Sequence, residues 1–411
     1  MASRRGARSR SEASRRLQPV RDAWNRIPPR ARNPLPVLVV IALAFLYPLY
    51  VEALPTGIPV IRNFPSVDTS VLIIIFVTMA VGLNIVVGYA GLLDLGYVAF
   101  FAIGAYTAGW LASGHFHGLT IHIGSVGVAE DFGGIHVSIW LVLIAAAFVT
   151  AIGGILIGFP TLRLRGDYLA IVTLGFGEII PQVFRNGDDI KGFNLTNGTF
   201  GINPIDSPGF GSTLGGALGL PESFQTSFIR DRLFFWTALV LLLITVFSSV
   251  RLRESRLGRA WIAIREDETA ASAMGVPLMR TKTWSYALGA FFGGAAGAYY
   301  ASYTANANPS SFLFQISVFL LCMVVLGGLG SMWGVIIAGT VLAWLNFEGL
   351  PNIGRWLNDT TPLDFEVSKY QAGIYGTAIV LMMLFRPEGL IPEGRRKREL
   401  EEHAADQSLP G

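Results

Sequence analysis

Apolar residues dominate this chain in ten blocks that alternate with short polar connections. A membrane-spanning helix needs about 20 mainly apolar residues, and most blocks approach that length, although several are shorter. We therefore expect an all-α, polytopic helical membrane protein with about ten transmembrane segments, some of them short or broken. The segments lie at residues 35–54, 71–87, 92–112, 137–158, 169–184, 233–250, 284–304, 313–326, 330–346 and 370–385.

Composition supports this interpretation. Of the 411 residues, 52% are hydrophobic and only 14% are charged. A soluble domain carries roughly 25% charged residues, so an ordinary soluble protein is excluded. The 47 glycines are typical of membrane helices that pack closely.

The basic residues predict how the chain is oriented in the membrane. Of the 31 Lys and Arg, 24 lie in the tails and connections on the N-terminal side of the membrane and 7 on the opposite side. Because Lys and Arg accumulate in cytoplasmic loops, both termini should be cytoplasmic and the number of spans even. An error of two spans would leave this result unchanged.

The same pattern divides the chain into parts. Residues 1–33 contain ten Arg and are predicted to be a disordered cytoplasmic tail near anionic lipid. Residues 34–392 form the transmembrane domain, with a cytoplasmic loop at 251–283 and an extracytoplasmic loop at 185–232. Residues 393–411 form a charged cytoplasmic tail.

Few residues suggest enzyme or metal chemistry. Cys322 is the single cysteine, so an intrachain disulfide is excluded and a buried thiol is favoured. No Cys/His cluster has the spacing of metal ligands. Four of the five His lie in one connection, for which we favour a solvated loop over a metal site: His115, His117, His122 and His136. Ser331 lies in a Gly-rich turn and has no His within a span to act as its base, so we expect no catalytic residue.

Two acids, Asp94 and Glu178, lie well inside apolar segments. Acids in a membrane are costly and usually face a cavity or a partner, and Gly-interrupted spans are typical of transport paths. We therefore predict a substrate pathway at Asp94 and Glu178 with the flanking glycines. The alternative is that the glycines only permit close packing and the acids are paired within the protein. The flanking glycines are Gly91, Gly96, Gly175 and Gly177.

The cytoplasmic loop 251–283 predicts a short helix with mixed charges and a small apolar face, which Gly275 and Pro277 end. Such a helix suits docking into the groove of a partner. A helix lying on the membrane is the alternative, but an anionic bilayer would repel the acidic run from Glu266 to Glu268. The apolar face comprises Ala270, Ala271, Ala273 and Met274.

None of the four Lys follows a Gly, so the phosphate-binding loop of P-loop ATPases is absent. If transport uses ATP, the nucleotide is bound by another chain, and this chain is expected to hold no cofactor.

Four stretches, in this order over roughly residues 70–392, resemble the permease subunits of ABC importers for branched-chain amino acids, the leucine/isoleucine/valine family and its LivM-like branch. The stretches are GLNIVVGYAGLLDLGYVAFFAIGAYTA (82–108), RLRGDYLAIVTLGFGEI (163–179), GRAWIAIREDETAASAMGVP (258–277), and VLGGLGSMWGVIIAGTVL (325–342) with LFRPEGLIP (384–392).

The resemblance implies a multi-pass permease of the bacterial inner membrane that imports branched-chain amino acids. It implies a heterodimer with a second, homologous permease and two cytoplasmic ATP-binding subunits. An extracytoplasmic binding protein would deliver the substrate, with residues 185–232 as its candidate docking surface. Nucleic acid is not an expected partner.

The resemblance also implies that residues 258–277 couple the permease to the ATPase. The importer pattern E-A-A-x3-G is matched by Ala270, Ala271 and Gly275, whereas Thr269 replaces the Glu. The other candidate coupling residues are Gly258, Arg259, Arg265, Glu266, Asp267 and Glu268.

The substrate is less well determined than the machinery. Many relatives have a GQLSLGH-like turn where this chain has Leu92, Asp94 and Tyr97. The same machinery importing urea, short amides or another small solute therefore stays open. A gradient-driven secondary transporter is less favoured, because the spans show no clear inverted repeat.

Overall fold

The structure, a computed structural model, describes residues 35–51, 64–124, 132–164, 166–209, 227–360, 367–386 and 389–391. The chain forms two units, residues 1–62 and 63–411. In the first unit, the described part is one apolar helix, α3, Leu35–Tyr50. The predictions for the tails 1–33 and 393–411 lie outside the described residues.

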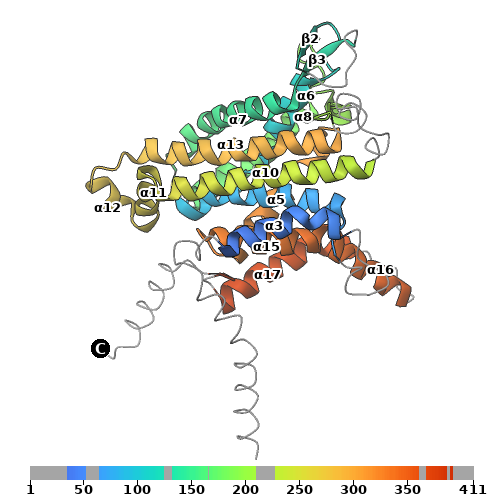
Figure 1. The fold of residues 1–411 in the computed structure, drawn as a ribbon. Helices are drawn as coiled ribbons and strands as arrows, with labels where there is room; N and C mark the ends of the chain where they lie inside the picture. The colour runs from blue at the N-terminus through green and yellow to red at the C-terminus, as the bar shows by residue number, and fades with distance from the viewer. Residues whose placement is uncertain are drawn as a thin grey trace, which may run out of the picture. The chain divides into compact units, whose positions relative to one another are not determined.

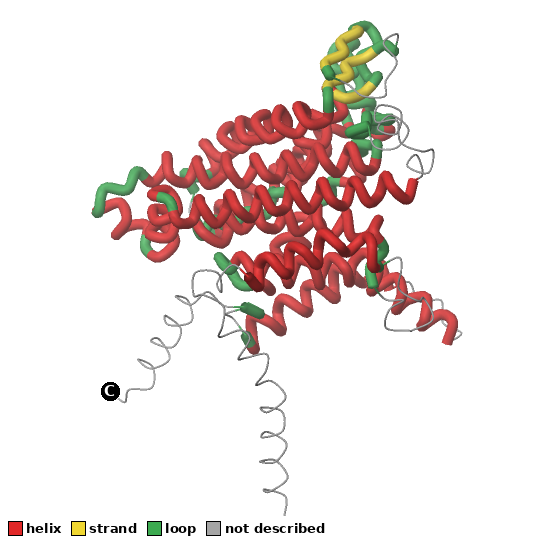
Figure 2. Tube along the Cα trace, viewed as in Figure 1, coloured by secondary structure: helices red, strands yellow, loops and turns green. Residues whose placement is uncertain are grey.

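Helices make up most of the second unit (Figure 1, Figure 2). They are α5 (Val67–Asn84), its π-helical continuation η1 (Ile85–Tyr89), α6 (Val98–Leu111), α7 (Ile139–Thr161), α8 (Asp167–Arg185), α10 (Ser227–Glu254), α11 (Arg256–Glu266), α12 (Glu268–Ala273), α13 (Leu278–Thr304), α14 (Phe314–Gly327), α15 (Met332–Trp344), the π-helical η5 (Leu345–Gly349), α16 (Leu350–Thr360) and α17 (Gln371–Phe385). The short 3₁₀ turns are η2 (Gly198–Phe200), η4 (Pro309–Ser311) and η6 (Val367–Tyr370).

The prediction of a helical polytopic membrane protein is confirmed. Each of the ten predicted segments overlaps a helix. Within the described residues, six helices are long and apolar enough to cross a membrane, and α3, α6 and α17 are apolar but shorter. Length and hydropathy thus identify six of the ten predicted spans.

Helix α13 packs against α7, α6 and α5, and its small residues permit this contact. A Cβ atom added at Gly294 would lie 2.2 Å from Thr150 Oγ1, and one at Gly297 would lie 2.1 Å from the carbonyl oxygen of Phe101. Small residues let membrane helices approach closely. The glycines of the predicted segment 284–304 therefore serve packing within this chain.

The Gly-rich stretch around Ser331 forms a tight turn between α14 and α15. Gly328 and Gly330 have φ angles of 105° and 83°, and the Ser331 hydroxyl accepts a hydrogen bond from the amide of Gly334, which caps α15. The amide of Leu390 donates to the carbonyl oxygen of Leu326 at 2.8 Å. The two sequence motifs at 325–342 and 384–392 therefore pack together.

A small sheet was not predicted from the sequence. Strands β1 (Ala112–Ser113), β2 (Thr120–Ile123) and β3 (Gly134–Val137) pair in the order β1-β3-β2 within the connection between α6 and α7. Short runs of alternating residues, TIHI and GIHV, suit strands. Figure 1 shows β2 and β3 at one end of the long helices and α11 and α12 at the other.

Candidate functional site

The predicted substrate pathway contains a break between two helices. Helix α5 widens into the π-helical turn η1, and the chain then runs without helix from residue 90 to residue 97 before α6 begins. The 14 residues of α6 span about 21 Å, which is less than the roughly 30 Å of the hydrocarbon core. The predicted segment 92–112 is thus a non-helical stretch followed by a short helix.

Non-helical backbone at membrane depth is tolerated only where protein satisfies its polar groups, and neighbouring elements do so here. The amide of Leu95 donates to Thr173 Oγ1 of α8 at 3.1 Å, and that of Val98 donates to Ser317 Oγ of α14 at 2.9 Å. The Tyr97 hydroxyl donates to the Gly289 carbonyl oxygen of α13 at 2.8 Å. Three helices therefore hold the break in place.

Asp94 lies inside this break, where its side chain is buried with 1% exposure. Its Oδ1 accepts a hydrogen bond from the amide of Gly96 at 2.8 Å, just before α6 begins. Its Oδ2 has no hydrogen-bond partner among the described residues, and the carboxylate interacts with the hydroxyl of Tyr286 on α13, which is likewise buried. The Asp94 carboxylate thus holds the backbone of the break through Oδ1 and also interacts with α13.

At three of the four predicted glycines, neighbouring atoms lie too close to accept a Cβ atom without moving. A Cβ atom at Gly96 would lie 2.2 Å from the Thr173 carbonyl oxygen, and one at Gly177 would lie 3.2 Å from Gly96 Cα. Gly91 has a φ angle of 68°, and a Cβ there would lie 2.7 Å from Arg265 Cγ. Gly175 differs, since a Cβ atom there would meet no described atom within 4 Å.

Glu178 does not lie with Asp94. Its side chain is exposed on α8, beside the exposed Ile171, Leu174 and Ile179 of the same helix. The structure therefore places one predicted acid inside the chain and the other on an outer helix face. Gly175 shares the open surroundings of that face, so Gly175 and Glu178 are available to a solute or to a second chain.

The connection that corresponds to the predicted cytoplasmic loop contains two helices, which corrects the single short helix inferred from composition. Helix α10 continues to residue 254 and α13 begins at residue 278, so the connection is 255–277. Asp267 separates α11 from α12 because its backbone is extended and its carboxylate caps α12, with Oδ1 accepting from the amides of Thr269 and Ala270 at 2.7 and 2.9 Å.

The predicted small apolar face is also divided. Ala271 is buried, whereas Ala270 and Ala273 are exposed and Met274 is 85% exposed. Gly275, with a φ angle of 85°, ends the helix as predicted. The outward surface of α12 is therefore small and apolar with one projecting thioether, and Arg259, Glu266 and Asp267 add exposed polar groups beside it.

Helix α11 is anchored firmly beneath this surface. Trp261 is fully buried, and its indole Nε1 donates to the Thr281 carbonyl oxygen at 2.8 Å. Gly258 is also buried, and a Cβ atom there would lie 2.2 Å from the Arg253 carbonyl oxygen. The anchoring by Trp261 was missed in the sequence, although a lone Trp in a charged loop is a usable signal for it.

Two contacts join α11 and α12 to the long helices. The Arg265 guanidinium donates to the Gly88 carbonyl oxygen in η1, next to the break. The Lys282 ammonium of α13 forms an ion pair with Glu268 of α12 at 2.8 Å, with side-chain exposures of 4% and 26%. A displacement of α11 and α12 would therefore act directly on η1 and α13.

At the end that carries the sheet, His122 and His136 lie in strands and not in a solvated loop, which corrects that prediction for these two residues, whereas His115 and His117 lie in a turn and His117 is exposed. His136 of β3 is buried and its Nδ1 lies 2.7 Å from Asp206 Oδ2, while the His122 ring stacks on it at 5.1 Å. Burial raises the pKa of Asp206, and the hydrogen bond and charge of His136 oppose this rise. No group of three metal ligands occurs among the described residues.

The pair His136–Asp206 connects the sheet to the stretch 186–209, the described part of the predicted extracytoplasmic loop. The Trp110 indole adds a hydrogen bond to the Leu195 carbonyl oxygen at 2.8 Å. This end exposes large apolar side chains, among them Phe132 (57%) and Phe200 (78%). Residues 210–226 of the predicted loop lie outside the described residues, and residues 227–232 belong to α10.

Comparison with known proteins assigns this chain to a family. Residues 66–384 match the family described as the permease component of the branched-chain amino acid transport system. The chain belongs to this family. The LivM permease of the high-affinity branched-chain amino acid system of Salmonella typhimurium is 38% identical over 367 residues, which cover 87% of this chain and 76% of the relative.

Two further relatives of this permease family extend the comparison. A probable LivM branched-chain amino acid permease of Methanocaldococcus jannaschii is 25% identical, over 78% of this chain and 91% of the relative. The LivH permease of the Escherichia coli high-affinity system is 23% identical, over 77% of this chain and 91% of the relative. No solved structure matches the chain. The break, the cytoplasmic loop and the Gly turn all lie inside the matched region.

Proposed function

We propose that this chain is the transmembrane permease subunit of an ATP-driven importer that moves branched-chain amino acids across the bacterial inner membrane. Separate ATP-binding subunits supply the energy, and this chain binds no cofactor and catalyses no reaction itself. The observation that carries the proposal is the 38% identity to LivM along most of the chain.

The cytoplasmic loop supports the coupling role. The exposed small residues of α12 and the projecting Met274 suit a shallow groove on an ATP-binding subunit. When the ATPase pair closes, α11 moves together with α13 because Trp261 anchors it to that helix. The contacts of Arg265 with η1 and of Glu268 with Lys282 carry this movement to the break and to α13. Coupling requires that these contacts differ between the two transporter states.

The substrate path runs along the exposed face of α8, completed by a second, homologous permease chain. Glu178 lies on this face and would meet the ammonium group of an amino acid. Helix α6 begins at the break beside α8. Asp94 acts from within the chain by holding this helix start. The similarity of the chain to both LivM and LivH supports a heterodimer of two permeases.

An extracytoplasmic binding protein docks at the end of the long helices that carries the small sheet. Exposed apolar residues around the sheet and the stretch 186–209 provide the surface, and His136–Asp206 fixes its shape.

Reconstitution of the importer tests the proposal. The permease pair, the ATP-binding subunits and the binding protein encoded beside this chain are placed in liposomes, and ATP-dependent uptake of labelled leucine is measured. We expect uptake that Met274→Asp abolishes without loss of membrane insertion, and that Glu178→Gln reduces. Uptake of urea or a short amide with no uptake of leucine would overturn the assignment of the substrate. Wild-type coupled ATP hydrolysis in Met274→Asp would overturn the docking role of α12.

A further inference from the structure

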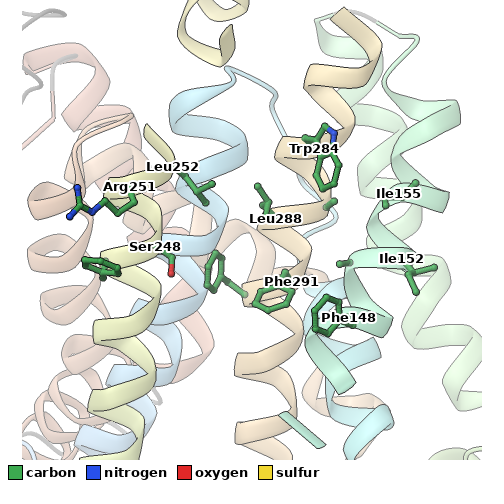
Figure 3. Close-up of a pocket in the computed structure, with 13 residues that line it drawn as sticks. Phe148, Ile152, Ile155, Ser248, Arg251, Leu252, Trp284, Leu288 and Phe291 are labelled. Carbon is green, nitrogen blue, oxygen red and sulfur yellow. The ribbon is translucent and has the colours of Figure 1, made fainter. Parts of the chain in front are cut away.

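An apolar cavity of about 650 Å³ opens on the surface formed by α7, α10 and α13, close to the end that carries α11 and α12. Figure 3 shows side chains of the three helices around it, with Leu288 and Phe291 of α13 between Ile152 of α7 and Ser248 of α10. Its volume lies within the range of roughly 300–1,000 Å³ that is usual for ligand sites. The lining is almost wholly apolar, so its occupant must present hydrocarbon.

The length of the cavity along the helices is close to the thickness of one leaflet's hydrocarbon layer. Along α13 its lining runs from Trp284 to Phe292, and along α7 from Phe148 to Ile155. At a rise of 1.5 Å per residue these stretches are about 12 and 10 Å long, against roughly 15 Å for half of the hydrocarbon core. A spanning helix of a partner would need a groove twice as long, whereas a lipid acyl chain of one leaflet matches this length.

Each of the three helices that form the cavity carries an arginine at its predicted cytoplasmic end. Arg251 lines the cavity, and its guanidinium is directed outward, away from α13 (Figure 3). Arg280 lies one turn before Trp284 on α13, and Arg163 follows the end of α7. All three are exposed, and Arg251 and Arg163 lie over the rings of Phe247 and Phe159 at 5.4 and 4.9 Å.

We infer that this cavity, with Arg251 at its edge, is a binding site for an anionic phospholipid of the cytoplasmic leaflet. An acyl chain fills the apolar cavity and the phosphate lies beside Arg251 at its edge. Guanidinium groups suit phosphate because their donors form a planar fork, and basic pockets between helices on the cytoplasmic side favour anionic headgroups. Trp284, which also lines the cavity, is exposed, and Trp rings favour the headgroup region of a membrane.

Lipid titration of the full-length chain tests the site. The protein is purified in detergent, and dioleoylphosphatidylglycerol or dioleoylphosphatidylcholine is added while the melting temperature and the bound lipid per chain are measured. We expect the anionic lipid to bind and to raise the melting temperature more than the neutral lipid does. Arg251→Glu should weaken phosphatidylglycerol binding about tenfold or more, and Ala151→Phe, which fills the cavity, should abolish the bound acyl chain.

A matched control lies on the same helix. Arg230, near the opposite end of α10, lies over the Phe234 ring at 5.5 Å in the same relation as Arg251 to Phe247. Arg230→Glu should leave phosphatidylglycerol binding unchanged. Equal binding of the two lipids, or an equal loss in Arg230→Glu, would overturn the inference. So would cross-linking of a cysteine placed at Ile152 to a second permease chain, because a protein would then occupy the cavity.

Discussion

Replacement of Gly96 by alanine tests whether the break before α6 depends on close packing against α8. The added Cβ would lie 2.2 Å from the carbonyl oxygen of Thr173, about 1.2 Å less than the 3.4 Å at which ordinary contact begins. The opposing atom is backbone within α8, so the two elements must separate. Separation would also strain the hydrogen bond from Leu95 to Thr173 Oγ1. Overpacking of this kind costs about 1–3 kcal/mol.

Gly175→Ala is the matched control, since this residue lies on the same helix as Thr173 and a Cβ there would meet no described atom within 4 Å. Alanine is favoured over glycine inside a helix by roughly 0.5–1 kcal/mol. Gly175→Ala should therefore keep or slightly raise stability, whereas Gly96→Ala lowers it.

The assay is thermal unfolding of the purified protein in detergent, followed by intrinsic tryptophan fluorescence. For a chain of 411 residues, a loss of 1–3 kcal/mol corresponds to a fall in Tm of roughly 1–4 °C. Leucine uptake by the reconstituted importer gives a second measurement, in which Gly175→Ala should reduce uptake with its Tm unchanged if the exposed face of α8 lines the path. A wild-type Tm in Gly96→Ala, or an equal fall in both variants, would refute the packing argument.

Two further predictions concern the ends of the helices. Glu268→Gln leaves the buried Lys282 ammonium without its ion pair and should uncouple ATP hydrolysis from uptake, with a stability loss of about 3 kcal/mol. The charge exchange Glu268→Lys with Lys282→Glu should recover part of the uptake, and no recovery would argue against the pair. His136→Leu strands the buried Asp206 carboxylate and should lower Tm by several degrees. Adding Asp206→Asn should restore part of that Tm, and a further fall on its addition would contradict the pairing.

The positions of the helices could be predicted because hydropathy is a local property. A run of about 20 apolar residues must be helical in a membrane, where every backbone group needs an internal partner. The sequence motifs likewise identified the family that residues 66–384 match. The same reasoning misplaced the start of the segment 92–112, because Leu92 and Leu93 are apolar whether the chain is helical or, as here, not helical.

By itself the sequence determined a helical membrane protein, its family and the stretches that matter, since all of these depend on neighbouring residues. Only the tertiary structure decided which residues of those stretches contact one another and which are exposed. Asp94 and Glu178 look alike in sequence, yet one is buried at a helix start and the other is exposed. The contacts of Arg265 with Gly88 and of Glu268 with Lys282 depend on how helices pack across the bundle. Packing brings together residues that no local pattern relates, because helices of similar apolar composition can meet in many ways and side-chain shape selects among them.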